Sequence, residues 1–264
     1  VNFAIAETGG FVVCTNEGNA DLGVSLPKVH IACMGIEKII PRAADLGVFL
    51  RLLARSATGQ PITTYSSHFH GPMSGGEMHI VLVDNGRTKM REEGLADMLR
   101  CIRCGACMNH CPVYQSVGGH AYGWVYPGPM GSILTPTYVG LENALDLPNA
   151  STLCNQCGVV CPVKIPLPDL MRKLREKQFE QGLKPKQETW GLTLWRWTAQ
   201  RPRIYAMLTQ IAARVLAVMG GSDKLIYNLP CGGGWTDGRD MPAPQGRTFR
   251  ELYKASRITS TSRP

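Results

Sequence analysis

The sequence has no long apolar run and no recognisable export signal. A membrane-spanning helix needs roughly 18 or more largely apolar residues, and the longest candidate, Ile204 to Met219, is short and contains Gln210 and Arg214. The first residues read as folded core and lack the basic-then-apolar layout of a signal peptide. The sequence therefore predicts no membrane span and no export. Because it starts with Val1 rather than Met, we expect it to begin inside a longer protein.

The sequence also lacks a convincing catalytic dyad and a nucleotide-binding fingerprint. His68, His70 and His79 are close in sequence, but exposed or core histidines explain them better than a metal site does. Glu7 and Glu17 stand singly beside glycines, and single carboxylates are weak indications of acid–base chemistry. We therefore predict no catalytic residues.

Net charge is unevenly distributed. The total of +8 arises in the last part of the chain, because residues 162–264 contain 18 basic and 8 acidic residues. A basic segment suggests an acidic partner, an anionic membrane face or nucleic acid, although solvated surface charge explains it equally well. We expect no nucleic-acid partner.

Ten cysteines are present, and seven of them form two short runs. The first is Cys101-x2-Cys104-x2-Cys107-x3-Cys111-Pro112, and the second is Cys154-x2-Cys157-x3-Cys161-Pro162. Such spacing without an export signal indicates metal binding rather than disulfides. Structural zinc usually takes two separated pairs of ligands, whereas this repeated run is the bacterial arrangement for iron–sulfur clusters. We predict two 4Fe-4S clusters.

The spacing also predicts which cysteines share a cluster. In two-cluster ferredoxins the fourth cysteine of a run ligates the other cluster. This rule assigns Cys101, Cys104, Cys107 and Cys161 to cluster one, and Cys111, Cys154 and Cys157 to cluster two. The assignment ties segments more than forty residues apart into one unit.

Cluster two lacks a fourth cysteine, because Ser151 stands where the first cysteine of the second run should be. Four outcomes remain open for the last iron: a Ser151 oxygen, a water, a thiolate from elsewhere such as Cys231, or no iron in a 3Fe-4S cluster. We favour a 4Fe-4S cluster with a non-cysteine ligand. Cys14 and Cys33 lie in apolar runs and are expected to be buried.

Three regions follow from the patterns along the chain. Residues 1–90 alternate short apolar, β-branched runs with one helical pattern, which predicts an α/β region. Residues 91–182 hold the cysteine runs, a stretch from Val117 to Gly140 that we expect to be an ordered loop, and an amphipathic helix ending at Gly182. Residues 183–264 contain a helix from Ile204 to Met219, expected to pack against a neighbour, and an irregular wrapping tail.

The segments around the cysteine runs resemble the iron–sulfur proteins of the lactate utilization protein B family, from the bacterial L-lactate oxidation system. The resemblance rests on NFAIAETGGFVVCTNEGNADL, on HIVLVDNGR, on CIRCGACMNHCPVY with the following GGHAYGWVYPGPMGSILTP, on STLCNQCGVVCPVKIPLPDL, and on GGGWTDGRDMPAPQGRTFREL. It covers essentially the whole chain. Cys231 is not part of the family pattern.

The resemblance implies a multidomain α/β plus α architecture. Residues 1–90 would be the second half of a lactate-utilization domain with a CoA-transferase-like α/β fold, followed by a helical two-cluster ferredoxin domain and a helical and irregular C-terminal region. It further implies a cytoplasmic electron-transfer subunit that works with two sister subunits while L-lactate becomes pyruvate. A quinone-linked acceptor and peripheral attachment to the inner face of the membrane fit the same picture.

Other functions stay open at this stage, because glycolate oxidase, anaerobic glycerol-3-phosphate dehydrogenase and heterodisulfide reductase subunits carry similar cysteine runs. The chain could serve another 2-hydroxy-acid or glycerol-3-phosphate oxidoreductase. A second alternative is a structural or regulatory metal-binding module. A third is substrate chemistry at the incomplete cluster, where an iron without a cysteine could act as a Lewis acid.

Overall fold

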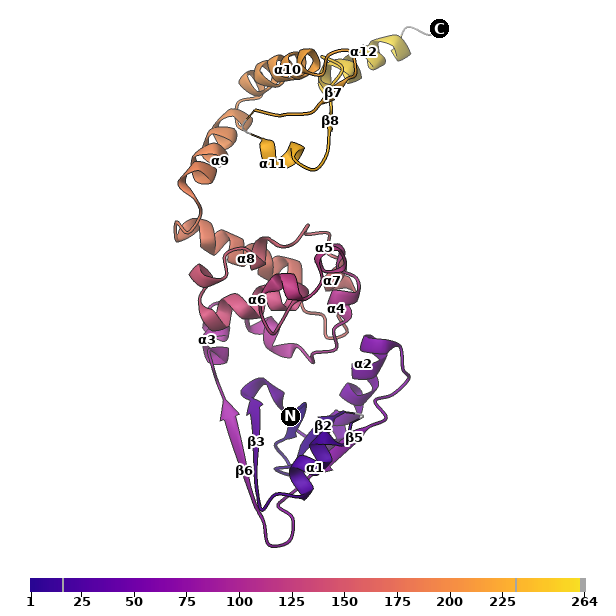
Figure 1. Ribbon diagram of the computed structural model, residues 1–264, viewed down its shortest axis with the longest axis vertical. Coiled ribbons are helices and arrows are strands. Elements are labelled where there is room, and N and C mark those ends of the chain that lie inside the picture. Colours follow the sequence, from indigo (N-terminus) through magenta and orange to yellow (C-terminus); the bar gives the residue numbers. More distant parts are fainter. Residues whose placement is uncertain (16, 231, 262–264) are drawn as a thin grey trace. The chain divides into compact units, whose positions relative to one another are not determined.

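The computed structural model describes residues 1–15, 17–230 and 232–261 (Figure 1). The chain divides into two compact units, Val1–Leu183 and Lys184–Pro264. Unit 1 contains both cysteine runs, so the α/β region and the cysteine-bearing region belong to the same unit.

Unit 1 opens with a four-stranded sheet in the order β4-β1-β2-β5. Strands β1 (Phe3–Ile5) and β2 (Phe11–Cys14) are antiparallel, β4 (Ile39–Ile40) runs parallel to β1, and β5 (Ser66–Phe69) runs antiparallel to β2. Gly9, with φ of +68°, makes the tight turn between β1 and β2 in a backbone region that favours glycine. The apolar run GFVVCT thus forms a strand, as its sequence predicts.

Two longer strands form a separate sheet. Strands β3 (Val29–Gly35) and β6 (Glu77–Val83) are parallel, with Val29 paired to Glu77 and Gly35 to Val83 (Figure 1). Most of their side chains are exposed in the described part of the chain. Helix α1 (Asn19–Ser25) precedes β3.

Helix α2 (Leu46–Thr58) ends at Gly59, whose φ of +77° closes the helix as the glycine stop in the sequence predicts. Its apolar face packs on the four-stranded sheet, where Phe49 stacks on Phe3. Ile102 and Val163, from the two cysteine runs, lie in the same apolar cluster. The sheet core therefore continues directly into the cysteine-bearing loops.

The rest of unit 1 is helical. Its elements are α3 (Arg87–Glu92), α4 (Ala106–Asn109), α5 (Pro112–Val117), α6 (Gly128–Val139), α7 (Gln156–Val159) and α8 (Leu167–Glu180), joined by short 3-10 turns. Helix α8 buries Leu167, Leu170, Met171 and Leu174, which confirms the predicted amphipathic helix. Helices α6 and α8 contact each other (Figure 1).

Helix α6 corrects one expectation. The Gly- and Pro-rich stretch from Val117 to Gly140 was expected to be a loop, but Gly128–Val139 is a helix whose residues from Gly128 to Pro136 are all buried. Pro129 stands in the first turn, where its missing N–H costs nothing. A Cβ atom at Gly131 would lie 1.6 Å from the carbonyl oxygen of Tyr126, so close packing requires this glycine. The small residues of α6 therefore allow close packing and do not form a turn.

Unit 2 contains α9 (Lys186–Ala199), α10 (Pro202–Met219), the short strands β7 (Leu225–Ile226) and β8 (Met241–Pro242), α11 (Gly233–Thr236) and α12 (Phe249–Thr261). The predicted helix from Ile204 to Met219 is present within α10. The C-terminal segment, expected to be irregular, includes helix α12. In the part of the chain that the structure describes, no helix is both long and apolar enough to cross a bilayer.

Candidate iron–sulfur centres

The first cysteine run lies in a tight loop of unit 1. Arg103 and Gly105 both have left-handed backbone, with φ of +64° and +80°. The chain then enters α4, which buries Cys107, and Cys111 caps the start of α5 by accepting a hydrogen bond from the Tyr114 N–H at 3.4 Å. The left-handed residues turn the loop back on itself, so that its first three cysteines face one region.

The second run repeats this conformation 50 residues later. Leu153 and Asn155 have φ of +54° and +67°, at the positions equivalent to Arg103 and Gly105. Asn155 replaces the glycine, which is consistent because asparagine tolerates left-handed backbone better than most residues. Helix α7 then buries Cys157, and the Sγ atom of Cys161 accepts the Ile165 N–H at 3.4 Å. The internal duplication seen in the cysteine spacing is therefore also a duplication of backbone shape.

Backbone groups also influence the sulfur atoms of both runs. The backbone of Ala106 counteracts the burial that raises the pKa of Cys104, and the backbone of Gln156, 50 residues later, lowers the pKa of Cys154. The backbone of Met130 and that of Gly158 likewise counteract the burial that raises the pKa of Cys107 and of Cys157. Backbone donors stabilise thiolate sulfur and tune the electronics of a bound metal group.

Four cysteines share one cavity in unit 1. Its lining includes Cys101, Cys104, Cys107 and Cys161, the set that crossed ligation assigns to cluster one. The remaining wall is mostly apolar and includes Met98, Ile102, Met130, Val163, Ile165 and Leu167. An all-sulfur ligand set in an apolar surround is the chemistry that iron–sulfur clusters require.

The buried thiols have strongly raised pKa values. Burial raises the pKa of Cys107 to about 12, with nearby Cys101 adding to the effect. Burial also raises the pKa of Cys157 to about 11, and here the neighbouring sulfurs include Cys111 and Cys154. A thiolate at such a position needs a positive counter-charge. The cysteine neighbours of Cys157 thus include both other members of the predicted second set.

Cys154 is exposed, unlike Cys157 and Cys161. A hydrogen bond from the Gln156 backbone, followed by one from the Thr152 hydroxyl, lowers the pKa of Cys154. The second set therefore has one member at the protein surface.

Ser151 is engaged locally. Its Oγ atom accepts the Leu153 N–H at 3.1 Å, and its carbonyl oxygen accepts a bond from Arg175 at 2.9 Å. The hydroxyl that bonds to Cys154 belongs to the next residue, Thr152, which the sequence pattern gave no reason to select. Cys231, the other sequence candidate, lies outside the described residues.

In the described ranges, no three His, Cys, Asp or Glu side chains converge as they would around a single metal ion. A cubane cluster distributes its four cysteines over four iron atoms, so its ligands do not meet at one point. Cys33, expected to be buried, is exposed on β3, because this strand pairs with β6 and its outer positions face solvent in the described part of the chain. Cys14 is partly buried.

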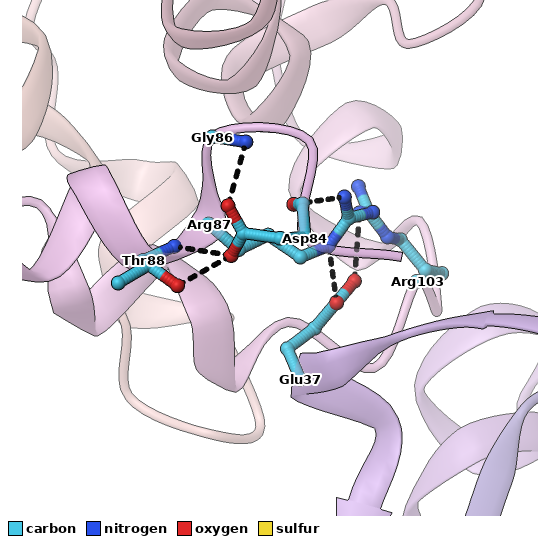
Figure 2. A network of polar contacts seen from close by, with 6 residues as sticks. All are labelled: Glu37, Asp84, Gly86, Arg87, Thr88 and Arg103. Carbon is cyan, nitrogen blue, oxygen red and sulfur yellow. Dashed lines mark hydrogen bonds and ion pairs between the residues drawn. The ribbon is translucent and has the colours of Figure 1, made fainter. Parts of the chain in front are cut away.

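A buried ion network adjoins the first cysteine loop (Figure 2). The carboxylate of Glu37 pairs with Arg87 and lies 3.7 Å from Nη2 of Arg103, the residue before Cys104. The side chains of Glu37 and Arg87 are only 5% and 10% exposed, so solvent hardly screens their pairing. Any side chain at Gly35 would collide with both Glu37 and Arg87, which explains the glycine.

Both arginines of this network are held in place from other sides. The Arg103 guanidinium lies 4.4 Å from the centre of the Tyr126 ring and donates to Sδ of Met130 at 3.1 Å. Arg87 donates to the carbonyl oxygen of Asp84 at 2.9 Å, and the Asp84 carboxylate accepts the N–H of Thr88 at 2.8 Å (Figure 2). Sequence reasoning missed these residues, because the charged groups that pair with Glu37 stand 50 and 66 positions away from it and give no local signal.

Comparison with known proteins divides the chain among three family models. Residues 1–91 match the LUD domain, residues 97–165 the 4Fe-4S dicluster domain, and residues 171–258 the C-terminal model of lactate utilisation protein B. Curated proteins named lactate utilization protein B, from Bacillus pumilus and Bacillus thuringiensis, are each 42% identical to 96% of the chain. The chain belongs to the lactate utilization protein B family.

Another curated relative, named an uncharacterized electron transport protein, comes from Escherichia coli and is 41% identical over 96% of this chain. The chain spans about half the length of the curated relatives it matches, 54% and 55% for those from Escherichia coli and Bacillus pumilus. No solved structure gives a significant match. The family models agree with the predicted order of a lactate-utilization region followed by an iron–sulfur region.

Proposed function

We propose that the chain is the iron–sulfur part of an electron-transfer protein that takes part in the oxidation of L-lactate to pyruvate. The observation that carries this proposal is the cavity lined by four cysteines from two separate runs. The names of the relatives, which refer to lactate utilization and electron transport, support the biological setting. Electrons would arrive from a partner subunit and leave towards the respiratory chain.

We assign Cys101, Cys104, Cys107 and Cys161 to a first 4Fe-4S cluster. Cys111, Cys154 and Cys157 ligate a second cluster, whose last ligand is not a cysteine of either run. When bound, such clusters accept and donate single electrons without a change of bonding partners. His110 stands beside Cys111 in the first run, and its Nδ1 atom lies 3.1 Å from the carbonyl oxygen of Ala106.

The protein's own residues set the conditions for this chemistry. Apolar side chains around Cys101 and Cys107 exclude water from the first site. Backbone N–H groups of Tyr114 and Ile165 donate to the sulfurs of Cys111 and Cys161, which stabilises negative charge there. Arg103 holds a positive charge beside the first site, anchored by Glu37. The exposed Cys154 places an edge of the second site at the surface, where a partner can exchange electrons.

Three further assignments complete the proposal. Residues 1–90 form the C-terminal part of a lactate-utilization domain with a CoA-transferase-like fold, residues 91–182 the ferredoxin-type domain, and residues 183–264 a C-terminal region. The partners are the sister subunits of the lactate-utilization system. The protein is cytoplasmic.

The cluster content can be tested on the chain after anaerobic reconstitution. We expect about eight iron atoms and eight sulfides per chain, and about half that in Cys104→Ser. Cys33→Ser is the matched control, because it removes an exposed cysteine outside both sets and should leave the counts unchanged. Zinc in place of iron would overturn the proposal, as would equal losses in both variants.

The functional setting needs a second experiment. With the sister subunits and L-lactate added anaerobically, the clusters should become reduced, as followed by EPR spectroscopy. D-lactate and glycerol 3-phosphate are the comparison substrates, and reduction by glycerol 3-phosphate alone would favour the other oxidoreductase. Clusters that resist dithionite would instead indicate a structural or regulatory metal-binding module.

Ser151 is tested separately by Mössbauer and EPR spectra of Ser151→Ala and Thr152→Val. A changed spectrum in Ser151→Ala assigns its oxygen to the last iron. A change in Thr152→Val alone reports the hydroxyl that contacts Cys154. A spectrum typical of a 3Fe-4S cluster in the unmodified protein would overturn our assignment of a complete second cluster.

A further inference from the structure

Helix α10 in unit 2 is oriented with its apolar face outward. Ile204, Leu208, Ile211, Val215 and Met219 share one side in sequence and were expected to pack against a neighbour. In the described part of the chain, however, Leu208, Ile211, Val215 and Met219 are 40% to 52% exposed, and Ile204 is half-buried. Together with the exposed Met207 and Val218, these four residues form the α10 stripe, which consists of Met207, Leu208, Ile211, Val215, Val218 and Met219.

The inward side of α10 combines Tyr205 and Leu216 with small and polar residues. Ala206, Thr209, Ala213 and Ala217 are half-buried, and the Thr209 hydroxyl donates to the Tyr205 carbonyl oxygen at 2.8 Å, which satisfies it within the helix. Isolated folding favours the opposite arrangement, because burial of the large apolar residues releases more free energy. The outward stripe is therefore explained by something that covers it.

Helix α9 has exposed aromatic residues beside basic ones. Trp190, Trp195 and Trp197 are 72%, 59% and 47% exposed, and the Arg201 guanidinium lies 4.2 Å from the centre of the Trp197 ring. Tryptophan and arginine concentrate at the boundary between apolar and aqueous phases, because each combines an apolar body with a polar end.

The net charge of unit 2 indicates which kind of partner covers the α10 stripe. Residues 184–264 contain 13 basic and 5 acidic residues, a net charge of +8, whereas residues 1–183 contain 15 of each. No acidic residue occurs between Glu188 and Asp223, a segment that includes nearly all of α9 and the whole of α10 and carries Arg196, Arg201, Arg203 and Arg214. Glu188 in the first turn of α9 and Glu251, which interacts with Arg214, are the carboxylates given for this surface, and apolar residues flanked by arginines match an anionic bilayer.

A protein partner would be expected to leave a different pattern. Specific protein interfaces combine apolar residues with hydrogen-bonding groups at a density of about one bond per 100–200 Å². The α10 stripe has no polar side chain within it, and its residues repeat every three or four positions along the helix. An amphipathic helix that lies in the plane of a membrane has this composition.

We propose that α9 and α10 form a membrane-binding surface that takes an anionic phospholipid bilayer, with the α10 stripe inserted at the level of the lipid headgroups and acyl chains. Because no described helix is long and apolar enough to span a bilayer, binding is peripheral. The surface lies in unit 2, outside both cysteine runs, so it does not depend on the proposed electron transfer. Membrane binding would bring the proposed electron-transfer protein to the bilayer, where lipid-soluble electron acceptors are dissolved.

The test is co-sedimentation of the 264-residue chain with vesicles, compared between phosphatidylcholine alone and a three-to-one mixture with phosphatidylglycerol. We expect binding to the anionic vesicles that weakens as salt is raised from 0.05 M to 0.5 M. Val218→Asp should weaken binding roughly tenfold, because it places a charge in the stripe. Val125→Asp is the matched control, since Val125 in unit 1 is 79% exposed and Val218 is 82% exposed.

Circular dichroism of both variants would show whether they keep their helix content, and Ile211→Ser is a milder second variant. Brominated lipids should quench the fluorescence of the α9 tryptophans but not that of Trp124. Single Trp→Phe variants would separate the contribution of each tryptophan to the fluorescence. Equal binding of Val218→Asp and Val125→Asp would overturn the proposal. So would the absence of binding to anionic vesicles at low salt, including the case in which a sister subunit covers the stripe instead.

Discussion

Oε1 of Glu37 lies 3.7 Å from Nη2 of Arg103, which joins the α/β part of unit 1 to the loop between Cys101 and Cys104. The Glu37 side chain is 5% exposed, so its charge acts through protein rather than through water. Arg87 pairs with the same carboxylate, and the half-buried Lys38, the next residue in the chain, interacts with it electrostatically. One negative group thus stands among three positive ones beside the proposed first cluster.

Replacement of Glu37 should raise the reduction potential of cluster one. Glu37→Gln removes a negative charge, so the surrounding cations favour the extra electron of the reduced cluster. Arg103→Gln should shift the potential in the opposite direction, and Arg103→Lys should restore most of it. The measurement is an EPR-monitored redox titration of cluster-loaded protein.

Asp97→Asn is the control for this titration, because the Asp97–Arg100 pair is about half exposed and water screens its charge. Loss of one partner from a buried pair costs about 3–5 kcal/mol, so the double variant Glu37→Gln with Arg103→Gln is also needed. Its potential should lie between those of the single variants. Potentials that do not respond to either charge would contradict the predicted coupling.

Gly131→Ala should destabilise unit 1 strongly. The added methyl group would lie 1.6 Å from the carbonyl oxygen of Tyr126, and backbone cannot move away cheaply, so we expect a loss of about 3 kcal/mol or more. Gly191→Ala, in the middle of α9, meets no atom within 4 Å and should instead gain up to about 1 kcal/mol from helix propensity. Denaturant unfolding measures both, and similar effects would contradict the packing of α6.

Left-handed backbone at Asn155 predicts an asymmetric response to substitution. Asn155→Gly should be nearly neutral, whereas Asn155→Val should cost about 1–2 kcal/mol, because a β-branched side chain strains a φ of +67°. The same strain should reduce the yield of cluster two upon reconstitution. Retention of stability in the valine variant, measured by thermal unfolding, would show that the loop adopts another conformation.

Removal of the clusters should loosen unit 1 selectively. Cys107, Cys157 and Cys161 belong to the apolar core that also contains residues of α6 and α8. A bound cluster that joins the two runs stabilises the folded state by mass action. Hydrogen exchange should therefore speed up across residues 96–167 after chelation of iron, while α9 and α10 in unit 2 stay unchanged. Uniform protection before and after iron removal would argue against ligation by these cysteines.

Local patterns in the sequence predicted several parts of the molecule. The spacing of Leu167, Leu170, Met171 and Leu174 identified α8, because apolar residues three or four positions apart lie on the same face of a helix. The two cysteine runs identified the positions that line the cavity, since their spacing reflects short-range geometry. Within α8 and within each cysteine run the information is local, whereas the rule of crossed ligation was needed to join Cys161 to the first run.

Non-local features were not predictable in the same way. Glu37, Arg87 and Arg103 meet only because the chain folds back on itself, and no short pattern records this. Helix α6 was taken for a loop, since glycine and proline break helices in solvent but are tolerated where neighbouring residues leave no room for side chains. The direction in which α10 presents its apolar face depends on surroundings outside the helix, so periodicity found the face but not its exposure.

The 50-residue repeat has a consequence for the history and the behaviour of the molecule. Two loops with left-handed residues at equivalent positions and the same Cys-Pro ending are the form expected of an ancestral duplication. One copy lies in an apolar cavity and keeps every sulfur, whereas the other has an exposed cysteine and a serine. This difference would give the two proposed clusters different reduction potentials, and Ser151→Cys is the replacement that would give the second run its fourth cysteine.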